Sequence, residues 1–304
     1  MFEGSSTALV TPFRGGVVDW KAYGALIDEQ IAAGTDAIVA CGTTGESPTL
    51  SDEEKIEIFE FTAQRVRRRI PVLAGTGTYD THHTIELSRA AKKSGADGLL
   101  LVVPYYSKPT QAGLTAHFRA VADAVDLPVM LYNIPGRSGV NMTPETIIRL
   151  AAHKNIVSVK EASGSCDAVT QIAAGSAITV VSGDDSLTLP FMACGARGVV
   201  SVVSNLVPAD VKALVQACLR GDFAAALKVH RRLFPLIKAA FIETSPIPVK
   251  VALSLMGKCT RELRLPLCDP DPANEEKLRA ALAAYGLLGT GKPAKGGKPV
   301  RRGR

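Results

Sequence analysis

Short apolar runs alternate with longer amphipathic runs along the first 220 or so residues of this chain. The short runs are rich in β-branched and apolar residues without polar alternation, which is typical of strands in a parallel sheet covered on both faces. We expect eight such strands, at residues 4–12, 37–41, 71–77, 98–104, 128–133, 156–160, 178–182 and 198–203.

Helix-start signals introduce the amphipathic run after each strand. Asp19 is an expected N-cap, Ser51 with Glu54 forms the pattern of a capping box, and Thr143 stands before Pro144 at a first helical position. We therefore expect helices that begin near residues 20, 51, 80, 110, 143, 165, 187 and 208.

Eight strand–helix units over about 220 residues predict a TIM (β/α)8 barrel, of class α/β, with a doubly wound open sheet as the alternative. Beyond residue 222 the pattern changes, since the runs at 222–237, 248–256 and 272–285 have helical spacing and no strand pattern follows. We divide the chain into a barrel at residues 1–221, a small C-terminal helical region at 222–288 and a tail at 289–304.

The formal net charge of +6 changes this picture little. The tail carries six basic residues and no acidic one, so the remainder of the chain is close to neutral. Its Gly/Pro/Lys/Arg composition predicts disorder. A neutral body argues against a nucleic-acid-binding protein, although the tail alone could contact polyanions weakly.

The cysteines and the lengths of the apolar runs further limit the class of protein. The six cysteines are scattered and form no C-x-x-C pair, which predicts reduced thiols and a cytoplasmic protein rather than a zinc site or a disulfide framework. No apolar run is long enough to cross a membrane, and the first residues lack the pattern of a secretory signal.

Candidate chemistry gathers where the expected strands end, the edge at which TIM barrels place their active sites. Lys160 ends an apolar strand, where partial burial lowers the pKa of an amine and favours a Schiff base with a 2-oxo acid. The alternative is a lysine without a catalytic role, whose amine extends into solvent.

The other strand ends supply groups that complement an imine-forming lysine. Tyr132 can shuttle protons, and Thr44 and Tyr106 can connect it to solvent by hydrogen bonds. The Gly42–Gly45 turn, with Thr43, offers N–H groups and hydroxyls to a carboxylate, and Arg137 can grip a second one.

Each of these residues also has a structural interpretation. The tyrosines can be packing residues, the two threonines can cap the next helix, and Arg137 can be an ordinary surface residue. Asp184 and Asp185 suggest a cation, but without histidine partners they fit capping or turn positions better, so we expect no metal.

Together these residues resemble the dihydrodipicolinate synthase / N-acetylneuraminate lyase family of class I pyruvate-dependent aldolases, over residues 4–288. The phrases that carry the resemblance are T-A-L-V-T-P-F at residues 7–13, G-T-T-G-E at 42–46, P-Y-Y at 104–106, Y-N-I-P-G-R-S-G at 132–139, V-K-E at 159–161 and P-I-P-V-K at 246–250.

The resemblance implies that Lys160 forms an imine with pyruvate, whose enamine attacks L-aspartate 4-semialdehyde in the diaminopimelate route to lysine. Tyr132, Thr44 and Tyr106 would form the proton relay, with Tyr106 supplied by a neighbouring subunit of a homotetramer. Thr43 and Thr44 would hold the pyruvate carboxylate and Arg137 that of the semialdehyde. The backbones of Gly183 and Val200 would line the site, with no cofactor or metal.

The pair Thr43-Thr44, together with Arg137 after the Y-N-I-P turn, points to the synthase branch of the family. The lyase branch has Ser-Thr at the first position and lacks the arginine. The alternatives are another aldolase of the family, acting on a 2-keto-3-deoxy sugar acid or N-acetylneuraminate, and a barrel that binds an acid without catalysis. Many synthases of the family are inhibited by lysine. Here Lys55, Tyr79 and His83 replace the usual histidine, asparagine and glutamate, so we expect weak or no inhibition.

Overall fold

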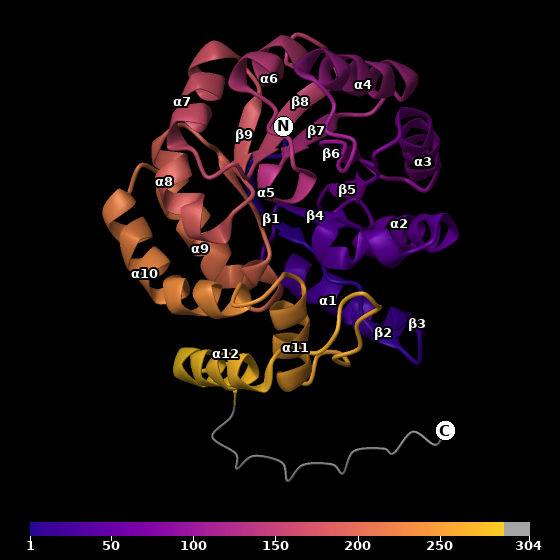
Figure 1. Cartoon of the computed structure of the whole chain (residues 1–304). Helices are drawn as coiled ribbons and strands as arrows, with labels where there is room; N and C mark the ends of the chain where they lie inside the picture. Colours follow the sequence, from indigo (N-terminus) through magenta and orange to yellow (C-terminus); the bar gives the residue numbers. More distant parts are fainter. Residues whose placement is uncertain (289–304) are drawn as a thin grey trace.

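A closed barrel of eight parallel strands forms the centre of the molecule (Figure 1). The computed structural model describes residues 1–288, so the expected basic tail, 289–304, lies outside the described residues. Around the barrel, β1 pairs with both β4 and β10, which closes the sheet. The strands are β1 (Gly4–Ala8), β4 (Ala37–Ala40), β5 (Val72–Gly75), β6 (Gly98–Val102), β7 (Val129–Asn133), β8 (Ile156–Glu161), β9 (Thr179–Ser182) and β10 (Gly198–Ser201). The prediction of a TIM barrel is confirmed.

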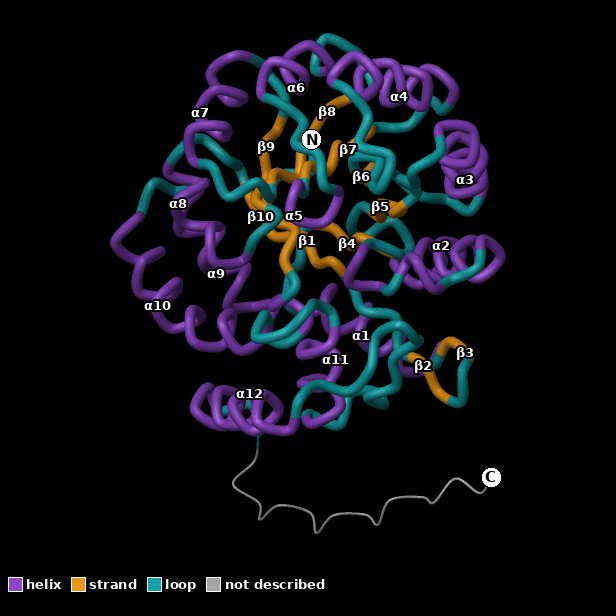
Figure 2. The backbone as a smooth tube through the Cα atoms, in the orientation of Figure 1, coloured by secondary structure: helices purple, strands orange, loops and turns teal. Residues whose placement is uncertain are grey.

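Eight helices follow these strands in turn and form a ring outside the barrel (Figure 2). Their starts match the expected capping signals: the Asp19 side chain accepts from the Ala22 N–H, and Ser51 and Glu54 form a complete capping box. The helices are α1 (Trp20–Ala32), α2 (Asp52–Val66), α3 (Thr81–Lys93), α4 (Gln111–Ala124), α6 (Pro144–Leu150), α7 (Cys166–Gly175), α8 (Thr188–Ala193) and α9 (Pro208–Leu219).

The apolar core has two layers, because side chains alternate between the two faces of each strand. One layer fills the space between the sheet and the helices. The other fills the barrel interior with aliphatic and sulfur-containing side chains, one phenylalanine and one tyrosine, namely Phe2, Ala8, Ala37, Val39, Leu73, Leu100, Met130, Tyr132, Val181 and Val200. Tyr132 and Val200, two of the expected site residues, therefore belong to the barrel interior.

Several local features differ from the sequence-based expectation, and β1, for example, ends at Ala8 rather than at Pro12. Strand β8 continues one residue beyond Lys160, to Glu161. A short hairpin, β2 (Phe13–Arg14) and β3 (Val17–Val18), precedes α1, and its turn is held by the distant Glu262 carboxylate, which accepts the Gly15 and Gly16 N–H groups at 2.8 and 2.5 Å. A single helical turn, α5 (Pro135–Ser138), follows β7.

The C-terminal region continues as α10 (Phe223–Ala240), α11 (Ile247–Leu255) and α12 (Pro272–Tyr285). Figure 1 shows these helices together on one side of the barrel, where α10 packs against α9 and α12 packs against α10 and α11. Within residues 1–288, no helix has the length and apolarity needed to span a membrane.

Candidate active site

The expected site residues lie at the carboxyl ends of neighbouring strands. Tyr132 on β7 and Lys160 on β8 are partners in the parallel register, as are Asn133 and Glu161. Since alternate residues of a strand face opposite sides, the barrel interior receives Tyr132 and Lys160, while Asn133 and Glu161 face outwards.

Lys160 is a buried amine without a counterion in contact. Its side chain is only 5% exposed, and its Nζ lies 4.1 Å from the centroid of the Tyr132 ring. Among residues 1–288, no group forms a hydrogen bond or ion pair with this amine. Burial lowers the pKa of Lys160 to about 8; the Asp185 carboxylate opposes this change and Arg137 adds to it. About a tenth of such an amine is uncharged and nucleophilic at pH 7.

Gly183 leaves the room that the lysine side chain occupies. A Cβ added at this position would lie 3.1 Å from both Cγ and Cε of Lys160, and 2.8 Å from the Cβ of Ala162. The Gly183 N–H donates to the Glu161 carbonyl at 2.7 Å. A side chain at Gly183 would therefore displace the amine.

Tyr132 is a buried phenol that stays protonated over the physiological range. It is 5% exposed, and burial raises the pKa of Tyr132 to about 12, with Arg137 and the Thr43 hydroxyl acting in the opposite direction. The Thr43 hydroxyl thus lies close enough to affect the pKa of Tyr132, while the expected relay role of Thr44 stays a prediction. Both threonines lie in the short 3₁₀ helix η1 (Thr43–Gly45) after β4, with Thr44 buried.

Arg137 comes from α5 and lies at the open end of the site. Its Nη2 donates to the Ser245 carbonyl at 3.0 Å, so the C-terminal region fixes one end of the guanidinium. The remaining donors of the guanidinium fork are suited to a carboxylate. The positive charge also lies near enough to affect the pKa values of Lys160 and Tyr132.

Tyr106 differs from the other expected relay residues because it is not packed within this chain. It is 94% exposed and adopts a left-handed backbone conformation, with φ of +70°. Such a conformation is uncommon for a bulky residue. The contribution of Tyr106 to a neighbouring subunit stays a prediction.

A cavity of about 540 Å³ opens beside these residues. It is lined by strand-end residues, among them Gly42, Thr43, Tyr132 and Arg137, and by residues of the following helices and loops, namely Ser47, Pro48, Lys55, Thr78, Tyr79, His83 and Tyr105. Lys160 does not line this cavity itself, but its Nζ lies 4.1 Å from the centroid of the Tyr132 ring, which does.

The two adjacent acids after β9 have structural partners. Asp184 accepts from the Ser186 N–H at 2.8 Å, and Asp185 accepts from Ser201 Oγ and from the Val202 N–H at 2.9 Å. This matches the capping interpretation. In the described part of the chain, no group of three or more His, Cys, Asp or Glu side chains is placed to hold a metal ion.

Sequence reasoning missed a second buried carboxylate beside the lysine. Glu161 accepts from Asn133 Nδ2 at 3.0 Å and from the Ser163 N–H at 2.7 Å, and burial raises its pKa. Asn133 Oδ1 in turn accepts the Met142 N–H, which ties down the segment that carries Arg137. The available signal was an acid directly after an expected buried strand, where a charge requires partners.

Comparison with known proteins matches this arrangement to one family. Residues 1–285 match the model of the dihydrodipicolinate synthetase family. The chain belongs to this family. Its relatives include the 4-hydroxy-tetrahydrodipicolinate synthase of Geobacter sulfurreducens, which is 53% identical over 290 residues, 95% of this chain and 100% of the relative.

Solved structures of family members have the same fold. Dihydrodipicolinate synthase from Aquifex aeolicus superposes with a TM-score of 0.94 at 49% identity, covering 95% of this chain and 100% of that one. The enzyme from Cyanidioschyzon merolae with lysine bound gives a TM-score of 0.92 at 43% identity, over 94% of this chain and 99% of that one. The family resemblance expected from the sequence is confirmed.

Proposed function

We propose that this chain is a 4-hydroxy-tetrahydrodipicolinate synthase, which condenses pyruvate with L-aspartate 4-semialdehyde. The observation that carries the proposal is Lys160, a buried, unpaired amine with a pKa of about 8 beside the protonated phenol of Tyr132. Family membership and curated relatives of that name, about half identical over nearly the whole chain, support it.

In the first half of the reaction, the Lys160 amine adds to the C2 carbonyl of pyruvate. The Tyr132 phenol protonates the resulting hydroxyl, which leaves as water, and an imine remains. The positive imine accepts the electron pair released when a proton leaves C3, so the lysine itself serves as the electron sink and a nucleophilic enamine forms.

In the second half, C3 of the enamine adds to the aldehyde carbon of the semialdehyde, which restores the imine. The amino group of the semialdehyde then adds to C2, expels the Lys160 amine and closes the ring. Thr43 and Thr44 hold the pyruvate carboxylate and Arg137 that of the semialdehyde, while the backbones of Gly183 and Val200 line the site. Tyr132, Thr44 and Tyr106 relay the protons.

The direct test is turnover of pyruvate with L-aspartate 4-semialdehyde by the purified protein. Ring-closed product is expected from these two substrates. A panel of other aldehydes, including N-acetylmannosamine and glyceraldehyde, tests the alternative of another aldolase in the family. Faster condensation with one of those sugars than with the semialdehyde would replace the synthase assignment, because Arg137 is the residue that favours a second carboxylate.

The assembly belongs to the same proposal. A homotetramer would cover the exposed Tyr106 and bring it to a neighbouring site. Mixing Tyr106→Phe chains with Lys160→Ala chains tests this, since a mixed oligomer would contain sites with both Lys160 and a donated Tyr106. Activity that exceeds the sum of the separate variants is expected, and none beyond that sum would place Tyr106 outside the site. A cytoplasmic location is proposed because all six cysteines are free.

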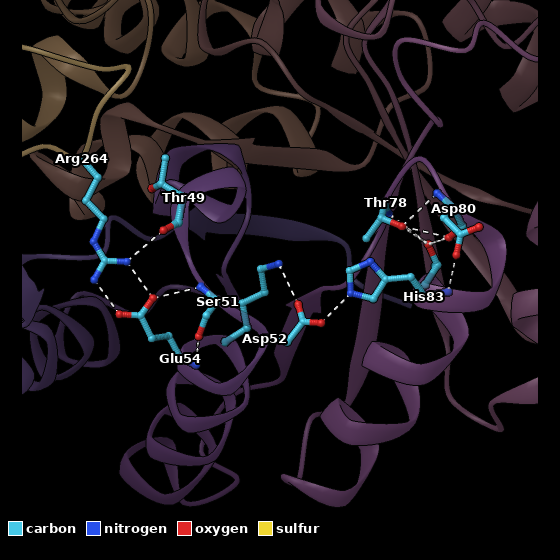
Figure 3. Close-up of polar contacts among 10 residues, drawn as sticks. Thr49, Ser51, Asp52, Glu54, Thr78, Asp80, His83 and Arg264 are labelled. Carbon is cyan, nitrogen blue, oxygen red and sulfur yellow. Dashed lines mark hydrogen bonds and ion pairs between the residues drawn. The ribbon is translucent and has the colours of Figure 1, made fainter.

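We also propose that lysine inhibits this enzyme weakly or not at all. Lys55 and His83 both line the cavity; the Lys55 ammonium lies 3.2 Å from Asp52, and His83 Nε2 lies 2.6 Å from the other oxygen of the same carboxylate (Figure 3). The Asp52 carboxylate is thus already shared, and an incoming ammonium would meet Lys55. Half-inhibition by millimolar lysine or less in a steady-state assay would refute this, and a Lys55→His/His83→Glu variant should be the more sensitive form.

A further inference from the structure

We propose that the buried ion pair between Glu46 and Lys250 positions the Thr43–Thr44 turn, and that Lys250 thereby controls how tightly the site holds pyruvate. The inference rests on the proposed function and deepens it. Neither side chain belongs to the reaction described above, and Lys250 comes from the C-terminal region, 204 residues away from Glu46 in sequence.

The pair itself is fully enclosed. Lys250 Nζ donates to Glu46 Oε1, and both side chains are 0% exposed. The ammonium lies 4.0 Å from the centroid of the Phe13 ring, and the second carboxylate oxygen accepts the Arg264 N–H at 3.1 Å. Enclosing two charges is costly, and a buried pair adds little to stability compared with apolar side chains of similar size. A role in fixing local geometry accounts for its presence.

Glu46 is joined directly to the turn that carries the two threonines. It ends the η1 helix in a left-handed conformation, with φ of 57°, and its N–H donates to the Thr43 carbonyl at 3.1 Å. A non-glycine residue keeps this conformation only where surrounding contacts impose it. Here the side chain supplies those contacts, because the ion pair anchors the carboxylate on the far side of the turn.

A second residue of the C-terminal region holds the next part of the same segment. The Arg264 guanidinium donates to the Thr49 carbonyl at 2.9 Å and to Glu54 at 2.7 Å (Figure 3). Thr11 Oγ1 donates to the Gly45 carbonyl at 2.8 Å from the barrel side. The turn is thus held between the barrel and the C-terminal region, and Lys250 provides the buried contact of the C-terminal region with it.

Loss of the pair should act on pyruvate before it acts on the chemical step. With the turn free to move, the hydroxyls and N–H groups that meet the pyruvate carboxylate lose their alignment. We expect the KM for pyruvate to rise about tenfold, the scale at which supporting residues act on binding. At saturating pyruvate the bound carboxylate realigns the turn, including Thr44 of the proton relay, so kcat should fall less than about threefold. The KM for the semialdehyde should stay unchanged, because Lys160, Tyr132 and Arg137 keep their positions.

Two variants and one matched control test this in the full-length protein. Lys250→Met removes one charge, and Glu46→Gln/Lys250→Met removes both, so that no buried charge is left unpaired if the single variant folds poorly. Lys258→Met is the control, since Lys258 pairs with Glu29 of α1 from the same C-terminal region without contacting the turn. Steady-state kinetics in each substrate, and borohydride trapping of the imine at low pyruvate, provide the readouts.

The result expected is a raised pyruvate KM and slower imine trapping in both pair variants, with wild-type values in the control. A double variant that folds as stably as the wild type and keeps the wild-type pyruvate KM would overturn the inference alone. A wild type that neither turns over pyruvate with the semialdehyde nor forms a pyruvate adduct would overturn the proposed function, and this inference with it.

Discussion

Two buried lysines of this protein have similar surroundings and, on the proposed function, opposite roles. Each ammonium lies over an aromatic ring, Lys160 at 4.1 Å from the centroid of Tyr132 and Lys250 at 4.0 Å from that of Phe13. Burial lowers the pKa of both. The difference is the partner: Lys250 donates to the Glu46 carboxylate, while Lys160 has no hydrogen-bond partner among residues 1–288.

On the proposed function, one fold thus uses the same side chain for structure and for chemistry. The carboxylate beside Lys250 favours the charged form, which cannot act as a nucleophile. Lys160 has no carboxylate in contact among the described residues, and its pKa of about 8 leaves part of it as a free amine that can act as a nucleophile. Two nearby charges adjust the pKa of Lys160 further: Asp185 raises it and Arg137 lowers it.

Removal of the unpaired lysine should have the largest effect. Lys160→Ala is expected to lower kcat by at least about 10³-fold, because no other group can form the imine. Lys250→Met should keep most of its turnover at saturating pyruvate. Measurement of product formation in both variants checks the contrast, and comparable losses of kcat would contradict it.

Removal of the paired lysine should have the larger effect on folding. Lys250→Met leaves the Glu46 carboxylate buried with only the Arg264 N–H, and we expect a loss of about 3–5 kcal/mol in the free energy of unfolding. Glu46→Gln/Lys250→Met should regain most of this loss. Urea unfolding of the three proteins measures it; a single variant as stable as the wild type would show that the pair is not the buried contact described here.

Removal of Lys160, the proposed nucleophile, should instead increase the free energy of unfolding. Its pKa is about 8 in the folded protein against 10.5 when unperturbed, so the unfolded state binds more protons between these values and stability rises with pH there. At pH 7 the protonated Lys160 costs about 3 kcal/mol. Lys160→Met should therefore stabilise the protein by about that amount at pH 7, and the gain should disappear by about pH 10.5. Unfolding at both pH values measures it, and destabilisation at pH 7 would refute the assignment.

The smallest predicted effects concern the charges around Lys160. Arg137→Met should raise the pKa of Lys160 and Asp185→Asn should lower it, each by less than about one unit. The pH profile of imine formation with pyruvate alone gives the measurement, since the semialdehyde carboxylate is then absent. Shifts in the same direction for both variants would contradict the electrostatic account.

The barrel, and the placing of the expected site residues at one end of it, were predictable from the sequence because both follow local rules. Apolar runs and capping signals are local, and the carboxyl ends of barrel strands always meet at one face, which brings Lys160, Tyr132 and Arg137 together. The sequence motifs shared with the family then indicated the reaction. The β2–β3 hairpin was missed because its turn is stabilised by Glu262, more than 240 residues away.

Long-range partners account for the rest of what the sequence did not reveal. Lys250 pairs with Glu46, and Arg137 donates to the Ser245 carbonyl, only because of where the C-terminal region packs on the barrel. The effect of the Thr43 hydroxyl on the pKa of Tyr132 depends on the geometry of a single 3₁₀ turn. Neither is encoded in a periodicity or a spacing.

Reductive trapping tests the central claim most directly, namely that the unpaired buried lysine is the nucleophile and the paired one is not. The full-length protein would be incubated with pyruvate, reduced with borohydride, digested and analysed by mass spectrometry. The account predicts a single pyruvate adduct on Lys160, absent from Lys160→Ala, with Lys250 unmodified. An adduct on Lys250, or no adduct on Lys160, would contradict it.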